Sequence, residues 1–229
     1  GLNQNIEVEL KEIKLILEPF NLKVKAKTLG STLKSKNGEI NIESIKTYIS
    51  LRSLLSNNFL ISFLEISTKS VEIKKIIAFV REINRDPKLF ILENFIQKGY
   101  LIADINLEFD ENGQIKDNYQ IKGFIRDGRV ELFAKYKFDK VNLIFDINKK
   151  LTKLEEIDFK YNSLDLFFKN LDIRNINNEF LFSGEINNKN FKINEENINK
   201  VLYRNIFGIK KINLSSKNTF SFKINKRFK

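Results

Sequence analysis

The sequence contains no cysteine and no histidine, and these absences exclude several classes of function. Without cysteine there is no disulfide scaffold, zinc ribbon, iron–sulfur site or thiol nucleophile. Without histidine, the commonest general base and metal ligand are missing, and serine–histidine and cysteine–histidine triads are ruled out. The acidic pairs that remain, such as Glu155-Glu156 and Glu195-Glu196, are typical of turns and of a helix first turn. We therefore expect no enzyme activity, no cofactor and no metal site.

Methionine is also absent, and the chain begins at Gly1. Because translation starts with methionine, we expect these residues to be part of a longer protein. Long apolar runs are missing as well. The longest wholly apolar run is Ile76–Val80, far short of the ~20 residues that span a bilayer. The N-terminal residues lack the basic-then-apolar order of a signal peptide, so any anchor or signal is expected outside this sequence.

What is present is a basic chain of 229 residues, with 40 Lys and Arg against 29 Asp and Glu and a formal net charge of +11. This charge makes nucleic acid and anionic lipid surfaces plausible partners, although the basic residues are scattered singly, as on an ordinary solvated surface. Nucleic-acid binding by stacking needs aromatic and basic side chains on one surface. Here Phe and Tyr fall in phase with Ile, Leu and Val, while Lys falls on the opposite phase. We therefore expect no nucleic-acid partner.

Apolar and polar residues alternate with a period of two along most of the chain, which is typical of strands with one apolar face. Turn signals separate the runs every ~8–12 residues, the spacing of an antiparallel meander. The pattern predicts turns at Asn37-Gly38, Asp110–Gly113, Asp127-Gly128 and Asn162-Ser163, a short link at Asp139-Lys140, and a bulge near Lys11–Glu12. In particular, Val130, Leu132, Ala134, Tyr136 and Phe138 are expected to form one returning strand.

A few stretches follow the helical period instead. The apolar residues between Ile73 and Ile83 recur at the spacing of one helix face, and Asp86-Pro87 precedes a second short helix that is expected to end at Gly99. One helical turn at Leu51–Leu55 and a short helix near 195–206 complete the prediction. Because no linker rich in Gly, Ser or Pro divides the chain, we expect one continuous domain over 1–229: an N-terminal sheet at 1–72, a helical insertion at 73–98 and a meander at 99–229.

Alternation alone leaves two architectures open. The apolar faces could meet as the dry core of a closed barrel or sandwich, and such a domain would bind lipid or membrane through its basic exterior. Alternatively, one long sheet could curl only partly and leave an apolar trough, in which case the apolar residues line a ligand site.

Several motifs resemble the AsmA-like family of envelope proteins, the group of AsmA, TamB and YhdP. The stretch PFNLKVKA at 19–26 is followed by GEINIESI at Gly38–Ile45, by SLRSLL at Ser50–Leu55 and by a strand with the ends LEI and VEI at Leu64–Ile73. The later residues Gly99–Phe109 and 113–130 resemble the repeated hairpins of that family. The insertion at 73–98 has no counterpart in the pattern.

This resemblance implies a mainly β fold: a long, curled antiparallel sheet, open and taco-like, with a few short helices. Such a β-groove is similar in principle to the chorein-type bridge-like lipid transfer proteins. It implies a membrane-anchored protein in the periplasm of a Gram-negative bacterium, fixed in the inner membrane by an anchor outside these residues. Its partners would be phospholipid and other envelope proteins, and its role inner-to-outer membrane lipid transport in outer membrane biogenesis.

The residues expected to line the groove are the in-phase apolar positions of the meander. Their role would be to solvate acyl chains. They are Leu101, Ile105, Leu107, Phe109, Tyr119, Ile121, Val130, Leu132, Tyr136, Phe138, Val141, Leu143 and Phe145.

Overall fold

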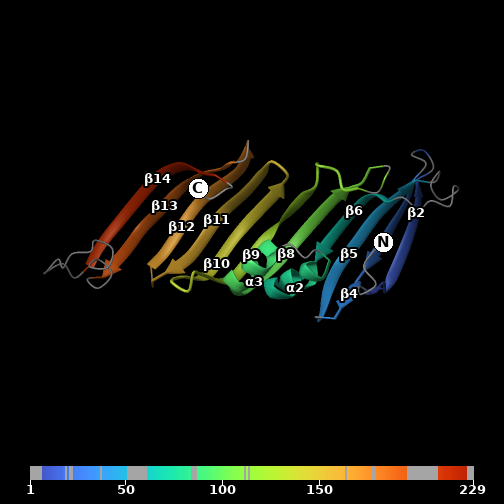
Figure 1. Ribbon diagram of the computed structural model, residues 1–229, viewed down its shortest axis with the longest axis horizontal. Coiled ribbons are helices and arrows are strands. Elements are labelled where there is room, and N and C mark those ends of the chain that lie inside the picture. The colour runs from blue at the N-terminus through green and yellow to red at the C-terminus, as the bar shows by residue number, and fades with distance from the viewer. Residues whose placement is uncertain are drawn as a thin grey trace.

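The computed structural model describes residues 7–18, 20, 23–36, 38–50, 61–83, 87–110, 112, 114–162, 164–176, 179–194 and 211–225. These residues form one antiparallel sheet of fourteen strands and two helices. Figure 1 shows an elongated single layer with β2 near one end and β14 at the other. The prediction of a mainly β, open antiparallel sheet is therefore confirmed.

The strands follow the chain almost in order, so that most neighbours in the sheet are neighbours in sequence. The N-terminal part contains β1 (Glu7–Glu9), β2 (Glu12–Glu18), β3 (Lys23–Leu29), β4 (Thr32–Ser35), β5 (Gly38–Ser50), β6 (Ile61–Thr68) and β7 (Val71–Glu72). The helices α2 (Ile73–Ile83) and α3 (Pro87–Phe95) come next. The meander contains β8 (Ile96–Glu108), β9 (Gln120–Leu132), β10 (Tyr136–Asn148), β11 (Leu151–Tyr161), β12 (Leu164–Ile176), β13 (Glu179–Asn194) and β14 (Lys211–Asn225).

The helices cover only part of one face. Ile73, Ile77 and Phe79 of α2 are buried, and Phe79 joins a small core cluster with Ile40 and Ile42 of β5. Figure 1 places both helices at one long edge of the sheet, in front of β8 and β9. The predicted first helix is confirmed. The second ends at Phe95 instead of Gly99, and Gly99 lies inside β8 with φ +142°.

The predicted turn at Asp127-Gly128 and the predicted link at Asp139-Lys140 are both wrong, because these residues are bulges inside β9 and β10. Asp127 and Lys140 have φ of +51° and +53°, a conformation that Asp tolerates better than most residues. Asn142 holds the bulges together: its Oδ1 accepts from the Asp127 N–H at 2.9 Å, and its Nδ2 donates to the Lys140 carbonyl oxygen at 3.0 Å. The chain reverses instead at Phe133, Ala134 and Lys135, so the run from Val130 to Phe138 is split between two strands.

Further bulges continue this line across the sheet. Glu156 of β11 has φ +49°, the register shifts between Phe168 and Asn170 of β12, and β13 shifts after Asn188. Bulges bend strands and raise their twist, so we expect the sheet to bend along this line. At the N-terminal end, the bulge predicted near Lys11–Glu12 is instead a break, since β1 pairs with β4 while β2 pairs with β3.

The sheet has no second layer in the described residues, so the alternative of a closed barrel or sandwich with a dry core is wrong. The accessible surface is 16205 Å², against about 10,800 Å² for a compact monomer of this mass. No described helix has the length and apolar character needed to cross a bilayer. The helical turn at Leu51–Leu55 and the helix near 195–206 lie outside the described residues.

Candidate functional site

One face of the sheet is apolar from end to end. Paired residues of antiparallel strands lie on the same face, so the register traces a row of side chains through eleven strands. We call this row the apolar rung, and all of its members are apolar except two threonines. It consists of Ile13, Thr28, Ile45, Ile66, Ile105, Ile121, Ile147, Thr152, Ile173, Phe182 and Phe222.

The opposite face is polar along the matching row. One sequence neighbour of each residue in the apolar rung belongs to a second row, which we call the polar rung. Only Leu29 in this row is apolar, and acidic residues alternate with basic residues in its middle part. It consists of Glu12, Leu29, Ser44, Ser67, Asp104, Lys122, Asp146, Lys153, Asp172, Ser183 and Ser221. Water therefore solvates one face of this layer well and the other poorly. We call the two sides the apolar face and the polar face.

A continuous row of aromatic rings crosses the apolar face from β10 to β14. The Phe159 ring lies 5.5 Å from both Phe138 and Phe168, measured between ring centroids, and Phe168 lies 6.2 Å from Phe220. Edge-to-face and stacked contacts of this kind stabilise a surface beyond its buried area. We call the whole set the aromatic row: Tyr161, Phe138, Phe159, Phe168, Phe220, Phe222 and Phe182.

Two glycines let large rings lie flat on the apolar face. A methyl group at Gly184 would lie 2.5 Å from the carbonyl oxygen of Asn170 and 2.8 Å from Cζ of Phe220. At Gly123 the corresponding atom would lie 2.8 Å from Cζ of Phe145. Each glycine thus pairs with a phenylalanine of the next strand and leaves the space that its ring fills.

Gly184→Ala is expected to destabilise the chain by about 1–3 kcal/mol, because the new methyl group overpacks against Phe220 and the neighbouring backbone. Urea unfolding followed by circular dichroism measures this loss. Ser183→Ala, one residue away on the polar face, is the matched control and should change stability by no more than about 0.5 kcal/mol. Equal effects of the two substitutions would show that Phe220 does not depend on Gly184.

Charge pairs connect neighbouring side chains on the polar face. Lys122 lies 3.3 Å from Asp146 across β9 and β10, and Lys153 lies 2.7 Å from Glu155. The hydrogen bond to Glu155 raises the pKa of Lys153. Similarly, the hydrogen bond between Lys34 and Glu9 raises the pKa of Lys34 and lowers that of Glu9. These exposed charge pairs keep this face solvated.

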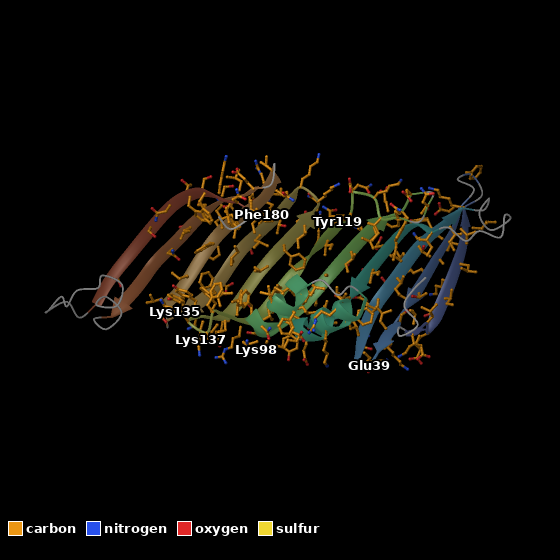
Figure 2. All side chains as sticks on the ribbon, viewed as in Figure 1. Glu39, Lys98, Tyr119, Lys135, Lys137 and Phe180 are labelled. Atoms are coloured by element: carbon orange, nitrogen blue, oxygen red, sulfur yellow. The ribbon has the colours of Figure 1, made fainter. Side chains whose placement is uncertain are left out.

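The structure places eleven of the thirteen predicted lining residues on the apolar face. They are Leu101, Ile105, Leu107, Ile121, Val130, Leu132, Tyr136, Phe138, Val141, Leu143 and Phe145. Leu101 pairs with Val71, which belongs to the cluster beneath α2. Tyr119 precedes β9 at the long edge opposite the helices (Figure 2). Phe109 follows β8, bridges to Ile115 and borders a hollow of about 480 Å³ that is lined mainly by polar-face residues.

The prediction missed the part of the apolar face that is richest in aromatic residues. Phe159, Phe168 and Phe182 belong to the aromatic row but were not among the predicted lining residues, although their alternation with polar neighbours carried the same signal. At the other end of the sheet, Ile13, Leu15 and Leu17 of β2 also lie on this face and are exposed.

Comparisons with protein-family models, with curated proteins and with solved structures give no match for this chain. The inference about function therefore rests on the geometry of the two faces. A layer with one solvated face and one apolar face offers a large binding surface for an apolar ligand, because burial of apolar area is favourable and needs no directional contacts.

Proposed function

We propose that the chain shelters phospholipid acyl chains on its apolar face and so carries lipid along a β-groove. The observation that carries the proposal is the apolar rung, which crosses eleven strands while α2 and α3 cover only part of that face. Protein domains usually bury an apolar sheet face against a second layer. In this proposal, acyl chains take the place of that layer.

The dimensions and energetics of the apolar face suit this ligand. Strands β8, β9 and β10 each have 13 residues, or about 43 Å at ~3.3 Å per residue. An acyl chain reaches through half of a ~30 Å hydrocarbon core, so it fits within the length of one strand. Each buried CH₂ contributes roughly 0.8 kcal/mol. Aromatic rings and branched side chains bury the acyl chain without any covalent reaction, which suits a protein that transfers lipid.

The cellular setting is proposed from the family resemblance. The AsmA-like motifs at Gly38–Ile45, Leu64–Ile73 and Gly99–Phe109 coincide with β5, with β6 and β7, and with β8. On this basis the chain would be a periplasmic segment of a protein anchored in the inner membrane, moving phospholipid toward the outer membrane. Nucleic acid is not proposed as a partner, because the aromatic row lies among apolar residues and not among lysines.

The absence of native cysteine permits a direct test of which face meets lipid. Phe222 lies on the apolar face of β14, and Ser221 beside it lies on the polar face. A fluorophore is attached to Phe222→Cys or to Ser221→Cys, and phospholipid with a spin label on its acyl chain is added. We expect quenching at position 222 and little at 221, because only the apolar face contacts the acyl chain. Equal quenching at the two positions would contradict the proposal.

A further inference from the structure

The long edge of the sheet that carries the helices brings together two segments distant in sequence. α3 packs against α2, β8 and β9. At its last residue, the Phe95 ring lies 5.6 Å from the ring of Phe133 in the turn between β9 and β10. We call α3 and this turn, Phe133–Lys135, the α3 edge.

The α3 edge leaves several large apolar side chains exposed, although the Arg81 guanidinium lies over the ring of Phe90. Phe90, Ile91 and Leu92 of α3 are all exposed, and Phe133 is 79% exposed. Consecutive exposed apolar residues on a short helix are unusual for a surface that meets only water. Moreover, Phe133 has φ +54°, a conformation that is unfavourable for a bulky residue. The Phe133 ring contacts Phe95 but stays largely exposed, and an external contact explains a phenylalanine at this position.

Positive charge surrounds these apolar residues. Figure 2 shows Lys98, Lys135 and Lys137 along the same long edge. Among the described side chains of this region, four carboxylates are paired: Glu72 with Lys75, Glu93 with Arg81, Glu131 with Lys137, and Asp139 with Arg129. In the described part of the chain, Lys74, Lys98 and Lys135 have no carboxylate partner, so the edge carries an excess of positive charge.

We propose that the α3 edge docks on the surface of a bilayer that contains anionic phospholipid. Ile91 and Phe133 insert between the headgroups, while Lys98 and Lys135 contact lipid phosphates. Apolar side chains together with lysines provide the two contributions that interfacial membrane binding needs. The excess positive charge favours an anionic bilayer over a neutral protein surface as the occupant. This docking does not require that the apolar face carry lipid.

The test is sedimentation of the full chain with vesicles. We expect binding to vesicles of phosphatidylcholine and phosphatidylglycerol, weak binding to phosphatidylcholine alone, and loss of binding at high salt. The double variant Ile91→Ser with Phe133→Asn should weaken binding about tenfold or more, because it removes the inserted apolar area. Lys98→Glu with Lys135→Glu should weaken binding by a similar factor, through the loss of attraction to anionic headgroups.

Stability separates docking from a merely structural role. Asn accepts a positive φ better than Phe, so Phe133→Asn alone should leave the urea midpoint unchanged or raise it while weakening vesicle binding. The controls are Ile115→Ser and Lys150→Glu, at exposed positions in connections at the opposite long edge. Equal losses in the controls would overturn the proposal. So would unchanged binding in the α3 edge variants, or a dimer in solution that these variants dissolve.

Failure of docking can be distinguished from failure of lipid carriage. Substitutions in the aromatic row should leave vesicle binding intact, because Phe220 and Phe222 lie on β14, away from the helices (Figure 1). Conversely, the Ile91→Ser and Phe133→Asn variant should keep acyl-chain quenching at position 222 when lipid is supplied in detergent.

Discussion

Phe220→Glu combined with Phe222→Glu is expected to abolish lipid binding while leaving the sheet folded. The two rings are in contact, with centroids 6.0 Å apart, and Phe222 is 48% exposed. A carboxylate at position 222 reaches water in the lipid-free chain. Phe220 is partly buried over Gly184, so its loss should lower stability while the strand pairing of β13 and β14 keeps the sheet folded. In the lipid-bound state the same group lies against acyl chains, which costs roughly 1–3 kcal/mol for each unpaired polar group. The two changes together should weaken binding about a hundredfold.

The matched control places the same two charges on the other face of the same strand. Thr219 and Ser221 alternate with the two phenylalanines, and both are exposed. Thr219→Glu with Ser221→Glu should therefore leave lipid binding within about twofold, since the polar face stays in water. Equal loss in both double variants would indicate that net charge, and not the apolar face, controls lipid binding.

The second large effect is expected where the sheet does have a dry core. Ile42 is only 2% exposed and belongs to the cluster beneath α2. Ile42→Asp buries a carboxylate without a partner, and we expect a loss of about 4 kcal/mol or more. That is a large fraction of the 5–15 kcal/mol that stabilises a typical domain. Urea unfolding and the helical signal in circular dichroism measure the effect.

Ile144→Asp is the control for this prediction. Ile144 is an isoleucine of similar strand context on the polar face, and it is 44% exposed. The same substitution there should change the free energy of unfolding by less than about 1 kcal/mol. If Ile42→Asp were tolerated equally well, α2 would not be packed on the sheet.

The strands and their two faces could be predicted because the alternation is local. Ile105 and Ile121 fall in phase on consecutive runs, and the register pairs them directly. The openness of the sheet could not be predicted in this way. Alternation says that one side of each strand is apolar, but whether two apolar sides meet depends on twist and on contacts between distant strands.

The reversal at Phe133–Lys135 shows why turn positions were harder to predict. Leu132 pairs with Tyr136 across this turn, so the apolar phase continues unbroken through the reversal and carries no sign of it. The bulges at Asp127 and Lys140 led to the opposite error, in which a turn or a link was predicted where the strand continues. Both need a residue that accepts a positive φ, which is the same requirement that marks a tight turn.

The most direct test of lipid carriage is native mass spectrometry of the purified chain, followed by extraction of bound lipid. The proposal predicts species heavier than the bare chain by the mass of one or more phospholipids. These species should persist in the Thr219→Glu and Ser221→Glu variant and disappear in the Phe220→Glu and Phe222→Glu variant. A folded chain that carries no lipid when phospholipid is supplied, or equal occupancy in the two variants, would contradict the central claim that the apolar face binds acyl chains.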